Sequence, residues 1–173
     1  MIAHLTLPGA IHAVLALLCI AAGFIQFLRP KRGAGHRARG YFYVYAMLVS
    51  DGTTLLVYRF TGHFNPFHVA AIVNFTLIVL AIVPLLRTPR PPNWRTTHYY
   101  FIAWSYVSPM SALAINIVAR LLPLTTREQI GLMALAVSVV TMTIAYILIA
   151  KYRPLPEVPT VSTELAGQSG ARS

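Results

Sequence analysis

Of all the side chains in this sequence, those of four histidines are best suited to chemistry, because imidazole is a ligand of haem iron and of divalent metals. His12, His36, His68 and His98 each stand at the entry of a different apolar, helix-length segment. If successive segments cross a membrane in alternating directions, His12 and His68 lie at one face and His36 and His98 at the other. The spacing therefore predicts two imidazole pairs, each able to hold one cofactor from two sides.

The composition indicates which solvent these segments meet. Hydrophobic residues make up 57% of the 173 residues and charged residues only 10%, which leaves too little polar surface for a water-soluble globule. A membrane-crossing helix needs about 20 predominantly apolar residues. Five segments meet this requirement, at residues 11–28, 40–58, 67–86, 98–121 and 129–150. We predict an all-α, polytopic five-helix bundle in residues 1–153, followed by a disordered cytoplasmic tail at 154–173.

The basic residues predict the orientation, since cytoplasmic loops keep more Lys and Arg than translocated loops do. Of the 14 Lys and Arg residues, only Arg59, Arg120 and Arg127 lie on the side opposite to the other eleven. We therefore expect the N-terminus outside and the C-terminus inside, in a bacterial inner membrane. The positive charge sits in loops at the ends of apolar spans, so membrane lipids are the expected partners and nucleic acid is not.

The faces on which the histidines lie favour the inner pair. The first segment places small residues, including Cys19 and Gly23, on the stripe of His12, where a planar cofactor would need room. The second segment gathers Asp51, Thr54 and Tyr58 on the side of His36, and the fourth gathers Ser105, Pro109 and Asn116 with His98. The stripe of His68 is apolar, with Asn74 offset from it. Polar stripes in lipid must face protein, water or ligand.

Asp51 is the only acidic residue inside a predicted span. An unpaired carboxylate at that depth costs about 2.5 to 3.5 kcal/mol on insertion scales, so it should be protonated or paired. Thr54, Tyr58 and Asn116 are its candidate partners, and we expect an interhelical hydrogen bond rather than a proton relay. Asp51, Asn74 and Asn116 thus form a second candidate set of intramembrane polar residues.

A purely structural interpretation competes with the ligand hypothesis. Amphipathic side chains favour membrane interfaces, small residues favour helix packing, and a histidine at a helix entry can simply bond to a loop. The lone Cys19 allows neither an intramolecular disulfide nor a cysteine-based zinc site. Sequence motifs of soluble hydrolases, nucleotide-binding proteins and metalloproteases are absent, and whether the protein is an enzyme stays open.

Several stretches resemble a known family. They are I-H-A-V-L-A-L-L-C-I-A-A-G-F-I-Q-F at residues 11–27, G-H-R-A-R-G-Y-F-Y-V at 35–44, G-H-F-N-P-F-H at 62–68 and H-Y-Y-F-I-A-W-S-Y-V at 98–107. Together they resemble a family of bacterial multi-pass membrane proteins, domain of unknown function 2306, over roughly the first 120 residues. The resemblance implies a membrane protein and brings no established activity with it.

A second resemblance is architectural. Two-haem transmembrane cytochromes b likewise place four histidines at the starts of four successive helices, paired on alternate helices. The similarity implies an outer haem between His12 and His68 and an inner haem between His36 and His98, with Arg37, Arg39 and Arg95 near the inner propionates. This chain departs from those cytochromes in having five expected helices instead of six, and it shares no motif with them beyond the histidines.

Two classes of function follow. In the first, which the sequence favours because it explains both the alternation of the histidines and the small-residue face behind His12, the protein is a b-type cytochrome that carries electrons across the membrane through bis-histidine haem b and meets a redox partner. In the second, it is a cofactor-free helical subunit or assembly factor of a larger membrane complex, with structural histidines. A divalent metal at one histidine pair is a smaller third hypothesis. An oligomer is compatible with each.

Overall fold

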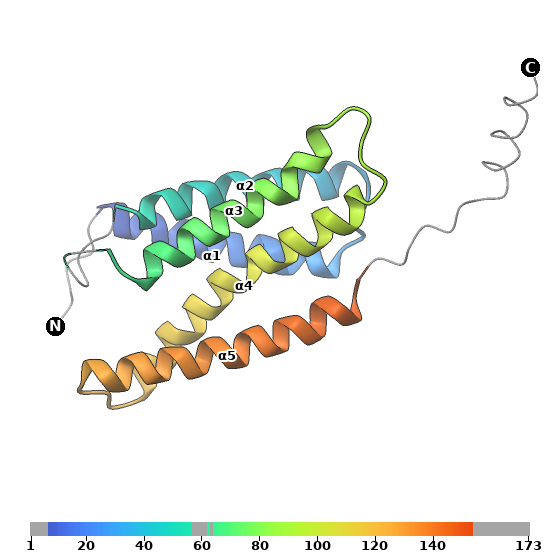
Figure 1. Cartoon of the computed structure of the whole chain (residues 1–173). Coiled ribbons are helices and arrows are strands. Elements are labelled where there is room, and N and C mark those ends of the chain that lie inside the picture. Colours follow the sequence, from blue (N-terminus) through green and yellow to red (C-terminus); the bar gives the residue numbers. More distant parts are fainter. Residues whose placement is uncertain (1–6, 57–61, 63, 154–173) are drawn as a thin grey trace, which may run out of the picture.

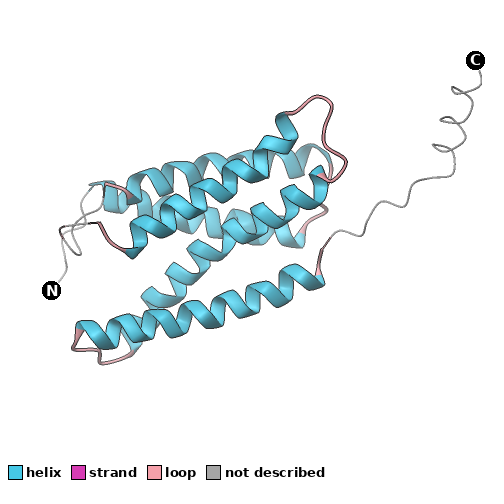
Figure 2. Ribbon diagram, in the orientation of Figure 1, coloured by secondary structure: helices cyan, strands magenta, loops and turns pink. Residues whose placement is uncertain are grey.

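The computed structural model describes residues 7–56, 62 and 64–153, and within these ranges it contains only helices and connecting loops (Figure 1, Figure 2). The helices are α1 (Leu7–Leu28), α2 (Gly33–Thr54), α3 (Pro66–Leu86), α4 (Trp94–Leu121) and α5 (Arg127–Lys151). The all-α prediction is confirmed for this part of the chain. Some sequence-based expectations concern residues outside the described ranges: Tyr58, Arg59 and the tail at 154–173.

Four of the described helices, α1, α3, α4 and α5, are long and apolar enough to cross a membrane. The remaining helix, α2, is not among them, because its two arginines, Asp51 and its tyrosines lower its hydropathy. The segment predicted as a second span at 40–58 is a helix in the structure, but it begins seven residues earlier and ends at Thr54.

The helix starts predicted for three segments were too late. α1 begins at Leu7, α2 at Gly33 and α4 at Trp94, before the predicted residues 11, 40 and 98. Hydropathy marks only the part of a helix that matches the hydrocarbon core, whereas the helical backbone continues into the interfacial zone. As a consequence, His12, His36 and His98 lie within the first two turns and not at the first residue.

The first four helices form a bundle. α1 and α3 each pack against both α2 and α4, so α1 lies diagonally opposite α3, and α2 lies opposite α4. The histidines of each expected pair therefore come from diagonally opposed helices. α5 packs against α4 alone and lies outside the bundle (Figure 1).

A proline lies inside α4, the helix that connects the bundle to α5. Pro109 has no backbone N–H, so the helical hydrogen bond to the Ser105 carbonyl is missing. Figure 1 shows the second half of α4 leaving the α1–α3 group and running toward α5. A second apolar cluster of Tyr99, Ala103, Val107 and Ile149 fills the α4–α5 contact, where the Tyr99 hydroxyl donates to the Ile149 carbonyl at 3.0 Å.

The core of the bundle combines apolar packing with buried polar groups. Cys19, Tyr43, Met47 and Ile78 form its main cluster, with Tyr106 packed against it. Large apolar side chains also stay exposed along the outer faces of all five helices. Such exposure is what a helix bundle presents to lipid, where apolar surface needs no burial in protein.

Candidate functional site

The C-terminal end of α1 and the N-terminal end of α2 are joined by a polar cluster around His36. The Gln26 side-chain amide group donates to the His36 carbonyl at 3.0 Å and to His36 Nδ1, and its Oε1 accepts from Arg39 Nε at 2.9 Å. These contacts fix the amide orientation, because a carbonyl only accepts and a guanidinium only donates. His36 Nδ1 is therefore an acceptor, and the ring hydrogen lies on Nε2.

His36 lies in the first turn of α2, ahead of the apolar part of the helix that begins at Gly40. Burial lowers the pKa of its imidazole below the ordinary value, and electrostatic interactions with His98, Arg39 and Lys31 lower it further. Lys31 is itself placed over the Phe27 and Tyr99 rings, at 5.9 and 5.3 Å from their centroids. The C-terminal end of α1 and the N-terminal ends of α2 and α4 thus meet around a neutral His36.

His98 on α4 makes the opposite type of hydrogen bond. Its Nδ1 lies 3.0 Å from the Ala81 carbonyl of α3. Because a carbonyl oxygen only accepts, Nδ1 carries the ring hydrogen, and the lone pair lies on Nε2. This contact joins α3 to α4, just as the Gln26 cluster joins α1 to α2.

His12 joins α1 to the end of α2 at the opposite side of the bundle. Its Nδ1 lies 3.0 Å from Thr54 Oγ1 and 3.1 Å from both oxygens of Ser50. The Thr54 hydroxyl donates its hydrogen to the Ser50 carbonyl at 3.0 Å, so it presents a lone pair to His12. His12 Nδ1 is accordingly a donor, and its Nε2 holds the lone pair.

His68 belongs to the capping box of α3. Asn65 Oδ1 accepts from the Phe67 amide at 2.9 Å, and His68 Nδ1 accepts from the Asn65 amide at 3.2 Å. The ring is only 1% exposed and stacks against Phe64, with a centroid distance of 5.2 Å. An acceptor Nδ1 places the ring hydrogen of His68 on Nε2, as in His36.

These hydrogen bonds decide how well the residues fit haem. A ligating imidazole offers the lone pair of one nitrogen while the other nitrogen donates to a carbonyl, carboxylate or water. His12 and His98 have this arrangement, and His36 and His68 have the reverse one. Each diagonal pair therefore contains one histidine that fits and one that does not, and bis-histidine ligation would require His36 and His68 to give up their present contacts.

The intramembrane polar residues do not gather as one set. Asn74 Nδ2 on α3 donates to Asp51 Oδ2 on α2 at 2.9 Å, and both side chains are buried. This interhelical bond is the role expected of Asp51, but the partner is Asn74 and not Thr54 or Asn116. Asn116 is exposed and donates to the Ala112 carbonyl of its own helix at 2.8 Å. Thr54 is instead a hydrogen-bond partner of His12.

The small residues of α1 allow α2 and α4 to pack closely against it. A Cβ atom at Gly23 would lie 2.3 Å from the Tyr106 ring, whose hydroxyl donates to the Ile20 carbonyl of α1 at 2.7 Å. Cys19 is fully buried against the Tyr43 backbone, and the Tyr43 hydroxyl bonds Ser105 Oγ at 3.0 Å. The space that the sequence offered to a planar cofactor is occupied by Tyr106 and Tyr43.

The arginines expected near an inner cofactor have different surroundings. Arg39 is half-buried in the Gln26 cluster, Arg37 is exposed, and the exposed Arg95 lies over the Trp94 ring at 5.3 Å. Within the described residues, no group of three or more His, Cys, Asp and Glu side chains is close enough to hold a metal ion together. The arrangement therefore links helices in pairs and does not converge on one centre.

A comparison with known protein families supports the assignment of this chain to a membrane. A family model described as predicted membrane protein (DUF2306) matches residues 9–152, which is most of the chain. The chain belongs to the DUF2306 family. The match includes α2 to α5 entirely and all of α1 except its first two residues, so the family resemblance noted in the sequence is confirmed and extends through α5. Neither the curated proteins nor the solved structures contain a match to this DUF2306 chain.

Some site residues of this DUF2306 member escaped the sequence analysis. Gln26, Ser50 and the Ala81 carbonyl contribute contacts to the histidines but are not among the residues predicted from the sequence. Gln26 carried a detectable signal, since a polar amide near the end of an apolar run needs a partner. The Ala81 carbonyl carried none, because every residue has one.

Proposed function

We propose that this membrane protein is a cofactor-free helical subunit or assembly factor, whose histidines hold its helices together. The observation that carries the proposal is the hydrogen bonding of two rings: Gln26 donates to His36 Nδ1 and the Asn65 amide donates to His68 Nδ1. Each ring hydrogen then lies on Nε2, which leaves no ligating lone pair there. The contacts of His12, His36 and His98 each link two helices, which is a sufficient structural role for them.

The outer face of α2 supports association with a further membrane protein. Tyr45 is 66% exposed and stacks on Tyr41 with a centroid distance of 6.4 Å. It lies five residues beyond Gly40, about 8 Å along the axis from the residue at which the apolar part of α2 begins. Exposed, stacked aromatic rings with a polar edge are a kind of surface that is enriched where proteins contact one another.

The proposal is tested by a double-mutant cycle between Gln26 and His36. We expect Gln26→Leu and His36→Leu each to lower the unfolding free energy in mild detergent by at least about 1 kcal/mol, because each removes the hydrogen bond between Gln26 and His36 Nδ1. Gln26→Leu also removes the bonds to the His36 carbonyl and to Arg39, so the double variant should cost little more than Gln26→Leu alone. Optical spectra of all four proteins, oxidised and dithionite-reduced, should lack haem bands.

The electron-carrying function is the second candidate, and His98 favours it. Its Nδ1 donates to a backbone carbonyl, which is the second contact usual for a haem or metal ligand. Haem b held there would supply one-electron chemistry, and His36 would have to leave Gln26 to become the opposite ligand. In that case the wild type shows sharp reduced bands, His98→Ala abolishes them, and Gln26→Leu leaves them in place. Such a result would replace our proposal.

A further inference from the structure

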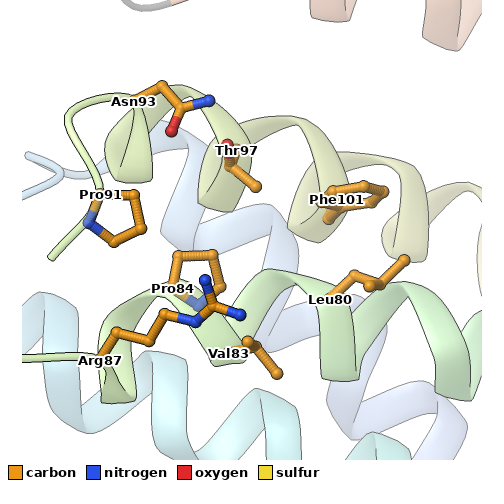
Figure 3. A pocket seen from close by; sticks show the side chains of 8 residues that line it. All are labelled: Leu80, Val83, Pro84, Arg87, Pro91, Asn93, Thr97 and Phe101. Carbon is orange, nitrogen blue, oxygen red and sulfur yellow. The ribbon is translucent and has the colours of Figure 1, made fainter.

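A cavity of about 280 Å³ lies between α3 and α4, at the end where the two helices are connected (Figure 3). Its wall is polar at the side of the connecting loop and apolar along the helices. The polar lining residues are Arg87, Asn93 and Thr97, and the apolar ones are Leu80, Val83 and Phe101, with Pro84 and Pro91 between them. A site divided in this way suits an amphipathic ligand.

The polar end of the cavity favours a negative charge. The sequence contains no acidic residue between Asp51 and Glu128, so neither α3 nor the 87–93 loop supplies a carboxylate. Arg90 and Arg95 both lie over the Trp94 ring, at 4.9 and 5.3 Å from its centroid. Arg87 is the arginine on the cavity wall, and Figure 3 shows its guanidinium beside Pro84.

The apolar end continues onto the membrane-facing surface. Leu80 and Val83 are exposed on α3, and Arg87 caps the C-terminal end of that apolar helix. Pro84 has no backbone N–H, so the Leu80 carbonyl lacks the usual helical hydrogen bond from position 84. At the depth where hydrocarbon gives way to head groups, the cavity thus offers a cation, hydrogen-bonding groups and an apolar wall.

We propose that this cavity binds one anionic phospholipid, with the phosphodiester group at Arg87 and the first part of an acyl chain along Leu80, Val83 and Phe101. Asn93 and Thr97 provide neutral hydrogen-bonding partners for the head group. Basic pockets between helices on the cytoplasmic side of a membrane are suited to such lipids. This inference is independent of the function proposed above.

The test uses the full chain in mild detergent and follows its thermal unfolding during titration with phosphatidylglycerol. Phosphatidylcholine, glycerol phosphate and inorganic phosphate serve as separate arms. We expect phosphatidylglycerol alone to raise the unfolding midpoint, because only this lipid combines the negative charge with acyl chains. An equal response to phosphatidylcholine, or a response to either soluble phosphate at the same concentration, would overturn the proposal.

Three variants locate the site. Arg87→Gln should weaken the apparent affinity for phosphatidylglycerol about fivefold, as expected for one basic residue near a charged head group, whereas Arg87→Lys should retain most of it. Val83→Trp keeps every charge but fills the cavity, and it should weaken the response at least as much. Arg120→Gln removes a helix-end arginine at the far end of α4 and should change nothing. Equal losses in Arg87→Gln and Arg120→Gln, or an unchanged response in Val83→Trp, would contradict the proposed site.

Discussion

Asp51 and Asn74 show how single residues hold this bundle together in a medium without water. Each side chain is buried, and the carboxylate accepts from the amide at 2.9 Å. Burial of either group without a partner costs free energy, whereas removal of both partners can be nearly neutral. The pair therefore specifies the register of α2 against α3 more than it adds stability.

The first prediction concerns this pair. Asn74→Leu should lower the unfolding free energy by about 1–3 kcal/mol, because it leaves a buried carboxylate without its amide donor. The double variant Asp51→Leu/Asn74→Leu should recover most of that loss. Thermal unfolding in detergent measures both effects, and Asn116→Leu is the control, since Asn116 is exposed and bonds only its own helix. Additive losses in the double variant would contradict this role.

A second prediction at this scale concerns pH and His36. The native contacts lower the pKa of His36 below its ordinary value of 6.5, so the unfolded chain binds its proton more readily. The stabilisation should be complete above about pH 6.5 and should decline as the pH falls below that value. Unfolding of wild type and His36→Gln, compared between pH 8 and 5, measures it. The variant should lose less stability on acidification; parallel curves would show that another group titrates.

At the scale of the helices, close approach between α1 and α4 depends on one glycine. Gly23 leaves the space that the Tyr106 ring fills, and the Tyr106 hydroxyl bonds the α1 backbone at 2.7 Å. Close approach through small residues is a common way for membrane helices to pack without a hydrophobic driving force. The contact between α1 and α4 is the least extensive of the interhelix contacts. The packing of Tyr106 against Gly23 is therefore important for holding these two helices together.

The third prediction follows from that contact. Gly23→Val should destabilise the protein by about 1–3 kcal/mol, because its side chain overlaps the Tyr106 ring and forces the ring to move. Combining it with Tyr106→Ala should reduce the additional cost of the valine. Thermal unfolding of the two single variants and the double variant separates these terms. Gly52→Val on α2 is the matched control and should have a small effect, because a Cβ atom there would meet nothing within 4 Å.

For the whole molecule, the arrangement of charges predicts how the bundle sits in the membrane. The loops at 29–32 and 87–93 carry Arg29, Lys31, Arg32, Arg87 and Arg90, whereas the loop at 122–126 carries no charge. The cavity, the His36 cluster and α5's basic end lie toward the first two loops. The charge bias therefore predicts that the cavity, the His36 cluster and the basic end of α5 lie at the cytoplasmic face.

The fourth prediction tests that orientation. Single cysteines placed at Thr88 and at Thr125, in a Cys19→Ser background, should react differently with a membrane-impermeant thiol reagent. Thr125→Cys should be labelled in intact spheroplasts, and Thr88→Cys only after the membrane is opened. Wild-type Cys19 is fully buried and should stay unlabelled in both. Labelling of Thr88→Cys in intact spheroplasts would invert the topology and move the proposed lipid site to the outer leaflet.

The sequence by itself determined the class of protein and its all-helical form. Long apolar runs in a chain with few charges leave helices as the form that satisfies every backbone group in lipid. Alternating helices also made it predictable that α1 lies diagonally opposite α3, and α2 opposite α4, because short loops bring consecutive helices together. Helix starts were less predictable, since α2 and α4 continue into polar residues that hydropathy does not count.

The tertiary structure alone decided what the histidines and Asp51 do. Spacing placed imidazoles at the helix ends, but the donor or acceptor state of each ring depends on partners from other helices, such as Gln26 for His36 and the Ala81 carbonyl for His98. The choice of Asn74 over Asn116 for Asp51 likewise depends on how helices rotate about their axes. Hydrogen bonds act over about 3 Å, so their pairing is settled by packing and not by residue type.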